Sequence, residues 1–164
     1  LYARGVWQPG WPAPPDGLSL RGVDSRAGHV AVAREVLGGR AELRTEDLTT
    51  YRPPPCEAVT LLDVLFYMSP DAQAALIARV HAALEPGGLL LIREPDAGAG
   101  ARFTVTRLAE GLFGLCRGRF KQRYHYRSAA QWVRLLEENG FTAERRPMSA
   151  GTPFANVLIE ARKR

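Results

Sequence analysis

Short apolar runs alternate along the chain with longer stretches in which apolar residues recur at helical spacing. Runs typical of strands are Leu18–Val23, Ala41–Thr45, Ala58–Leu62, Leu89–Ile92, Phe141–Arg146 and Phe154–Ala161. Helical spacing is seen over Arg26–Leu37, Ser69–Leu84, Phe103–Leu115 and Ser128–Gly140. The order β-α-β-β-α-β-α-α-β-β predicts an α/β fold with a doubly wound, mostly parallel sheet and helices on both faces.

Local signals sharpen several of these elements. Ser69 before a proline and an acid predicts a helix start, and Ser128 with Gln131 predicts a capping box. The continuous apolarity of Ala58–Leu62 is typical of a strand buried on both faces. We expect Pro86-Gly87-Gly88 to form a turn into the next strand. The expected buried helix positions are Val30, Ala33, Val36 and Leu37 in one helix, and Leu76, Ile77, Val80 and Leu84 in the next.

The last two strands have no helix between them, so they are predicted to be antiparallel neighbours, because a parallel pair needs a long crossover. No repeat or low-complexity segment interrupts the chain, which predicts one domain over residues 1–164. Leu1–Gly5 is typical of the end of a helix stopped by glycine.

Composition limits the functional classes. The 164 residues are 46% hydrophobic and 24% charged, which is ordinary for a soluble globular protein, and the net charge is +5. No apolar run reaches the ~20 residues of a membrane span, so we expect no membrane association and a cytoplasmic location. Two cysteines and three scattered histidines predict neither a disulfide framework nor a metal site.

Three acidic positions follow predicted strands, where ligands bind in such sheets. Asp24, followed by Ser25, could accept hydrogen bonds from ribose hydroxyls, or it could only cap the next helix. Glu46-Asp47-Leu48 could hold an adenine or form a solvated turn. Leu62-Asp63 leaves the most apolar strand, and Asp63 could line a ligand crevice or only brace the loop.

Taken in order and together with Leu84-Glu85-Pro86-Gly87-Gly88, these segments resemble the class I S-adenosylmethionine-dependent methyltransferases. The resemblance implies a Rossmann-like sheet with a reversed last strand and S-adenosyl-L-methionine as cofactor. It matches Asp24 to the ribose-binding acid, Glu46, Asp47 and Leu48 to the adenine contacts, and Leu62 with Asp63 to the methionine end. The family's opening strand and glycine-rich loop have no counterpart, so we expect them upstream of Leu1.

Methyl transfer from a sulfonium is a direct displacement, so the protein must mainly orient the acceptor and exclude water. The predicted acceptor lid is residues 97–127. The predicted catalytic residues, as base or orienting group, are His125 and Tyr67, with a partly exposed loop histidine as the alternative for His125. His29 and His81 lie inside predicted helices and are interpreted as structural. The predicted substrate-binding residues are Arg93, Glu94, Asp96 and Tyr124.

Basic and aromatic residues alternate from Arg117 to Arg127. This pattern suits a carrier protein, an anionic small molecule or RNA, or it is only a solvated basic lid. Because no RNA-binding module accompanies it, a small organic or carrier-tethered acceptor ranks before RNA. A non-catalytic interaction domain and a homodimer are the alternatives left open.

Overall fold

The computed structural model describes residues 17–116 and 123–164, with side chains omitted from 113 to 116. The predicted helix end at Leu1–Gly5 and the basic residues Arg117, Arg119 and Lys121 lie outside the described residues. The chain divides into two compact units, residues 1–51 and 52–164. Within the described residues, no helix has both the length and the apolarity that a bilayer crossing requires.

The described part of the first unit, residues 17–51, contains two parallel strands and one helix, β1 (Arg21–Asp24), α1 (Ala27–Leu37) and β2 (Glu42–Thr45). α1 ends at Gly38, whose left-handed backbone lets its N–H bond the carbonyl of Arg34. Val30 packs inside as predicted, but Val36 is 53% exposed. The predicted apolar face of α1 is therefore wrong at Val36, because the two short strands cover only part of the helix.

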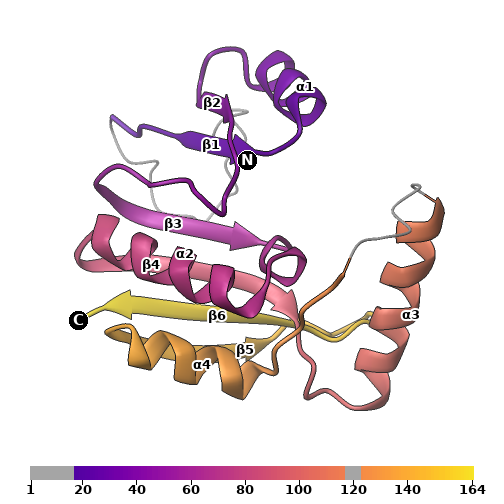
Figure 1. Ribbon diagram of the computed structural model, residues 1–164. Helices are drawn as coiled ribbons and strands as arrows, with labels where there is room; N and C mark the ends of the chain where they lie inside the picture. Colours follow the sequence, from indigo (N-terminus) through magenta and orange to yellow (C-terminus); the bar gives the residue numbers. More distant parts are fainter. Residues whose placement is uncertain (1–16, 117–122) are drawn as a thin grey trace. The chain divides into compact units, whose positions relative to one another are not determined.

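The second unit is built on a four-stranded sheet with the order β3-β4-β6-β5 (Figure 1). Its elements are β3 (Cys56–Leu62), η2 (Leu65–Tyr67), α2 (Pro70–Ala83), β4 (Leu84–Pro95), α3 (Ala101–Cys116), α4 (Ala129–Glu138), β5 (Phe141–Pro147) and β6 (Asn156–Lys163). β3 and β4 are parallel, and β6 runs antiparallel to both of its neighbours, β4 and β5. This confirms the predicted antiparallel terminal pair.

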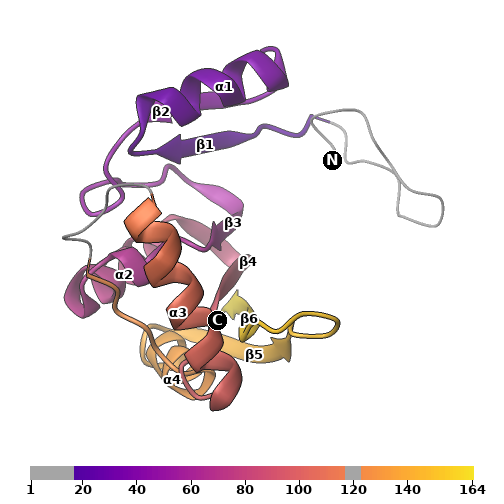
Figure 2. The ribbon, with the colours of Figure 1, turned by 90° about the vertical axis from the view of Figure 1, so that its right-hand side faces the viewer.

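Helices α2 and α4 lie on the same face of this sheet, as both views show (Figures 1 and 2). The core residues beneath them are apolar and fully buried: Leu76, Ile77 and Val80 of α2, Trp132 and Leu136 of α4, and Leu90, Ile92 and Ile159 of the sheet. Burying one such side chain contributes about 1.5–3 kcal/mol, so this layer is the main source of stability for the unit. The predicted buried face of α2 is confirmed.

Both predicted helix starts are confirmed. The hydroxyl of Ser69 accepts a hydrogen bond from the N–H of Ala72 at 3.3 Å. In α4, Ser128 accepts from the N–H of Gln131, whose side-chain oxygen accepts from the Ser128 N–H in return. Each arrangement satisfies N–H groups that the first helical turn leaves unpaired.

Two expectations for the strands need correction. Leu61 is buried, but Leu62 is 49% exposed, so β3 is not covered on both faces. Side chains alternate along a strand, so Leu61, which pairs with the buried Ile92, lies on the covered face and Leu62 lies on the opposite face. Pro86-Gly87-Gly88 lies inside β4, not before it. A register shift opposite Cys56 and the positive φ of Gly87 absorb these residues as an irregularity of the strand.

Helix α3 follows β4 and stands beside the carboxyl-terminal end of that strand (Figure 2). Two contacts hold it against the loop between β5 and β6. The Arg102 guanidinium donates to the carbonyl of Ser149 at 3.0 Å, and the Thr106 hydroxyl accepts from the N–H of Ala155 at 2.8 Å. The first turns of α3 are therefore held at the carboxyl ends of the strands, where ligands of α/β folds bind.

Candidate functional site

In the first unit, the predicted nucleoside contacts gather at one sheet edge. Asp24 pairs in register with Thr45, so both parallel strands end side by side. The N–H of Glu46 donates to the carbonyl of Asp24 at 3.2 Å, which places the segment Glu46–Leu48 next to Asp24 and Ser25. The structure therefore brings together all of the predicted residues of this unit.

The carboxylate of Asp24 has two neighbours. One oxygen accepts from the N–H of Arg26 at 2.8 Å, and the other lies 3.1 Å from the ring nitrogen Nδ1 of His29. Slight burial opposes ionisation, but these hydrogen bonds and the nearby charges outweigh it and hold the pKa of Asp24 below its usual value. Asp24 is consequently an ionised, accessible acceptor at a strand end. The interpretation of His29 as merely structural misses this contact.

Asp47 is largely occupied by its own turn. Its side chain accepts from the N–H of Thr49 at 2.8 Å, and its carbonyl accepts from the N–H groups of Thr50 and Tyr51. The Thr49 N–H lowers the pKa of Asp47. A closed turn of this kind presents the backbone and side chain of Leu48 in a defined conformation.

In the second unit, Asp63 ends β3 with a left-handed backbone, φ +56°, which is unusual for a residue other than glycine. Its N–H donates to the carbonyl of Arg93 at 2.9 Å, and its carboxylate lies 3.5 Å from the Arg93 guanidinium. Burial raises the pKa of Asp63, although the Arg93 charge opposes this. Strained backbone of this kind is common at functional sites, where surrounding contacts maintain it.

The side chain of Glu94 holds the turn after Asp63 in place. Its side chain is buried, and its two oxygens accept from the N–H groups of Val64, Leu65 and Phe66 at 3.0, 2.7 and 3.2 Å. Burial raises the pKa of Glu94 to about 7, against the effect of these three hydrogen bonds. Both oxygens are thus used by the protein itself, which favours a positioning role over the predicted contact with an acceptor.

The segment after Asp63 contributes Phe66 and Tyr67 to an aromatic cluster, whose other members are Phe103, Tyr124 and Tyr126. Phe66 and Tyr126 stack at 5.5 Å between ring centroids with 12° between their planes, and Tyr67 approaches Tyr124 at 5.6 Å. The N–H of His125 donates to the carbonyl of Phe66 at 2.7 Å. The structure therefore brings the predicted residues Tyr67, Tyr124 and His125 together, although they come from segments about sixty positions apart.

A buried glutamine that the sequence interpretation missed joins these segments. The side-chain nitrogen of Gln73 lies 3.0, 3.2 and 2.9 Å from the carbonyls of Leu65, Met68 and His125, and its oxygen accepts from Arg127 at 2.6 Å. The sequence contains one signal that points to this role of Gln73. Gln73 lies on the apolar face of the predicted helix, three residues before Leu76, and a polar group there needs buried partners.

The remaining predicted residues have structural partners. One oxygen of Asp96 accepts from the N–H groups of Gly98 and Ala129, which links the start of the predicted lid to the start of α4. Arg127 also donates to the carbonyl of Pro70 and lies over the ring of Trp132. Within the described part of the basic segment, Arg127 is therefore engaged internally and is not a free phosphate ligand.

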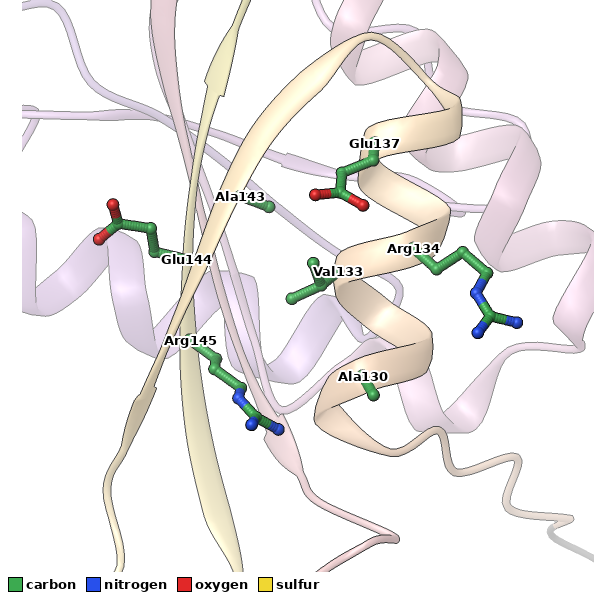
Figure 3. Close-up of a pocket in the computed structure, with 7 residues that line it drawn as sticks. All are labelled: Ala130, Val133, Arg134, Glu137, Ala143, Glu144 and Arg145. Carbon is green, nitrogen blue, oxygen red and sulfur yellow. The ribbon is translucent and has the colours of Figure 1, made fainter.

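A separate groove lies between α4 and β5. It is lined by Ala130, Val133, Arg134 and Glu137 of the helix and by Ala143, Glu144 and Arg145 of the strand. Val133 and Glu137 point from α4 toward the strand, and Ala143 and Arg145 point from β5 toward the helix (Figure 3). None of the predicted site residues lines this groove, and we do not assign the chemistry to it.

Comparison with known proteins decides the family. A family model described as a methyltransferase domain matches residues 12–145, which is most of the chain. The chain belongs to the class I S-adenosylmethionine-dependent methyltransferases. The predicted family, enzyme class and cofactor are confirmed by this match and by the relatives it resembles.

Two curated relatives and one solved structure are similar to this methyltransferase. A carboxy-S-adenosyl-L-methionine synthase from Chromohalobacter salexigens is 37% identical over 86 residues, covering 49% of the chain and 32% of the relative. A demethylspheroidene O-methyltransferase from Rhodobacter capsulatus is 33% identical over 113 residues, covering 68% of the chain and 27% of the relative. The N-methyltransferase NodS from Bradyrhizobium japonicum, in complex with S-adenosyl-l-homocysteine, superposes with a TM-score of 0.67 at 15% identity, covering 88% of this chain and 66% of NodS.

These likenesses confirm the predicted Rossmann-like α/β fold. The matched segments span about a third of the curated relatives' own length.

Proposed function

We propose that this protein transfers a methyl group from S-adenosylmethionine to a small organic or carrier-tethered acceptor. The observation that carries the proposal is the arrangement at the carboxyl ends of β3 and β4. There the strained turn at Asp63 leads into η2, which ends at Tyr67, and Tyr124 and His125 are held against the same segment. Such strand ends are where α/β sheets bind their ligands.

The residues present fit the nucleoside part of the cofactor. An ionised, accessible carboxylate at Asp24 is suited to accept hydrogen bonds from a ribose diol. Glu46 and the closed turn at Asp47–Leu48 adjoin it, so they would provide a polar group and an apolar surface for the adenine ring.

The predicted contacts for the methionine part, Leu62 and Asp63, belong to the second unit. Leu62 offers exposed apolar surface and Asp63 offers a carboxylate suited to an amino group. The cofactor supplies a methyl group bound to a positively charged sulfur, which is already electrophilic. The protein therefore needs to orient the acceptor and exclude water, and to remove a proton only if the attacking atom carries one.

Tyr67, Tyr124 and His125 are the proposed acceptor residues. The rings of Tyr67 and Tyr124 belong to the cluster of five aromatic side chains, which would exclude water from one side of an organic acceptor, and the backbone of His125 is bonded to Phe66 of that cluster. A histidine side chain can act as a general base toward a hydroxyl or amine. We propose His125 as this base and Tyr67 as an orienting group. Arg93 and Asp96, with their structural partners, would support the site and not contact the acceptor.

Internal engagement of Arg127 supports an organic acceptor over RNA. An RNA-binding surface needs cations that are free to reach phosphates, and Arg127 instead bonds Gln73 and Pro70. The predicted residues 97–127 would then act as a lid over an organic acceptor.

Two measurements test the proposal. Calorimetric titration with S-adenosylhomocysteine should give binding in the micromolar range, and a protein that does not bind would contradict the cofactor assignment. Transfer of a labelled methyl group should then be compared between small hydroxyl- or amine-bearing molecules, carrier-bound acceptors and RNA. Faster transfer to RNA than to every organic acceptor would reject the proposed acceptor class. His125→Asn should lower kcat and leave S-adenosylhomocysteine affinity unchanged if His125 removes a proton.

A further inference from the structure

The most informative unassigned contact is the chain of side chains behind Asp24. The guanidinium nitrogen NH1 of Arg26 lies 3.4 Å from Nε2 of His29, and Nδ1 of the same ring lies 3.1 Å from Asp24. These three residues come from the end of β1 and the first turn of α1. They form a line from Arg26 through His29 to the carboxylate.

The hydrogen-bonding properties of Arg26 and Asp24 determine which tautomer of the His29 ring can contact both of them. A guanidinium can only donate hydrogen bonds, so Nε2 of His29 must accept. Nδ1 must then carry the hydrogen and donate to Asp24, because an ionised carboxylate can only accept. The complete line therefore requires a neutral His29 with its hydrogen on Nδ1.

We propose that His29 is a positioning residue that orients the Asp24 carboxylate toward the ribose hydroxyls of the cofactor. The inference rests on the proposed role of Asp24 in binding S-adenosylmethionine. One Asp24 oxygen is held by the Arg26 N–H and the other by His29, so the carboxylate plane is set from both sides. Lone pairs on both oxygens remain for a diol.

Other charged groups around α1 do not take over this role. Among the described charged side chains of β1 and β2, Arg21 and Arg44 both pair with Glu42, and Arg44 also approaches Glu46. On α1 itself, Arg34 donates to the carbonyl of Leu43. Asp24 and Arg26 are the charged groups in contact with the His29 ring in the described structure.

The experiment is calorimetric titration of S-adenosylhomocysteine into five forms of the protein in the same buffer. His29→Ala should weaken binding by about three- to tenfold, which corresponds to the loss of one hydrogen bond. His29→Asn places an amide N–H close to the position of Nδ1, so its affinity should stay within about twofold of that of the natural protein.

The remaining forms separate this inference from the proposed function. Asp24→Ala should weaken binding, and adding His29→Ala to it should cause no further loss, because His29 acts through Asp24. If Asp24→Ala weakens binding but His29→Ala does not, the positioning role is overturned and the ribose role of Asp24 stands. If Asp24→Ala itself has no effect, both assignments fail. Equal loss of affinity in His29→Asn and His29→Ala would also overturn the inference.

Discussion

The two units use polar residues in opposite ways. In the second unit, Glu94 and Gln73 are buried, and each bonds several backbone groups that shape the proposed acceptor site. In the first unit, Asp24 and His29 are partly exposed and contact each other at a sheet edge. Buried polar groups are costly to leave without partners, whereas exposed ones can turn to water. We therefore expect substitutions of the buried polar residues in the second unit to lower the free energy of unfolding. Substitutions of Asp24 or His29 should leave it nearly unchanged.

The largest effect is expected for Glu94→Ala. It leaves the N–H groups of Val64, Leu65 and Phe66 without their acceptor in a buried place, so unfolding free energy should drop by about 3 kcal/mol or more. Denaturant unfolding measures this. The matched control is Glu160→Gln on β6, a surface partner of Arg146 and Arg162, which should cost no more than about 1 kcal/mol. Equal losses would remove the distinction between buried and exposed carboxylates.

Glu94 should also make the stability of the protein depend on pH. The folded protein keeps the proton of Glu94 up to a pKa of about 7, while the usual value is 4.5. Between these values the folded state binds more protons than the unfolded state, so stability falls as the pH rises, by at most about 3 kcal/mol. Unfolding curves of the natural protein and Glu94→Gln should therefore differ in slope with pH. Parallel curves would show that Glu94 ionises normally.

Gln73→Ala should have the next largest effect. It removes a donor to the carbonyls of Leu65, Met68 and His125 and an acceptor for Arg127, so we expect a loss of about 2 kcal/mol. Gln131→Ala, a change at an exposed residue that only opens the capping box of α4, should cost about 1 kcal/mol or less. If Gln73→Ala is the milder change, the buried network is not what joins these segments.

Asp24→Ala should change stability least, by about 0.5 kcal/mol or less, because the side chain is accessible to water. Its effect should appear in S-adenosylhomocysteine affinity, weakened by about 1.5–3 kcal/mol if the carboxylate binds the ribose. Glu42→Gln, in the neighbouring strand but away from its carboxyl end, serves as the control and should leave affinity unchanged. A large loss of stability in Asp24→Ala would break the comparison between the two units.

Much of the fold could be predicted from the sequence because the relevant signals are local. Ser69 caps α2 and Ser128 with Gln131 caps α4 through atoms only three residues away. The antiparallel arrangement of β5 and β6 follows from the short connection between them, which is too short for a crossover. The positions after strand ends, such as Asp24 and Asp63, were found in the same way.

Only the tertiary structure decided how these positions are used. The register between β3 and β4 pairs Leu62 with Arg93, and this alone places the Glu94 carboxylate under the turn at 64–66, about thirty positions earlier in the chain. Likewise, hydrophobic spacing identified an apolar face on α2 but not the carbonyl partners of Gln73. Periodicity reports which side of an element is apolar, whereas long-range partners depend on strand register and packing.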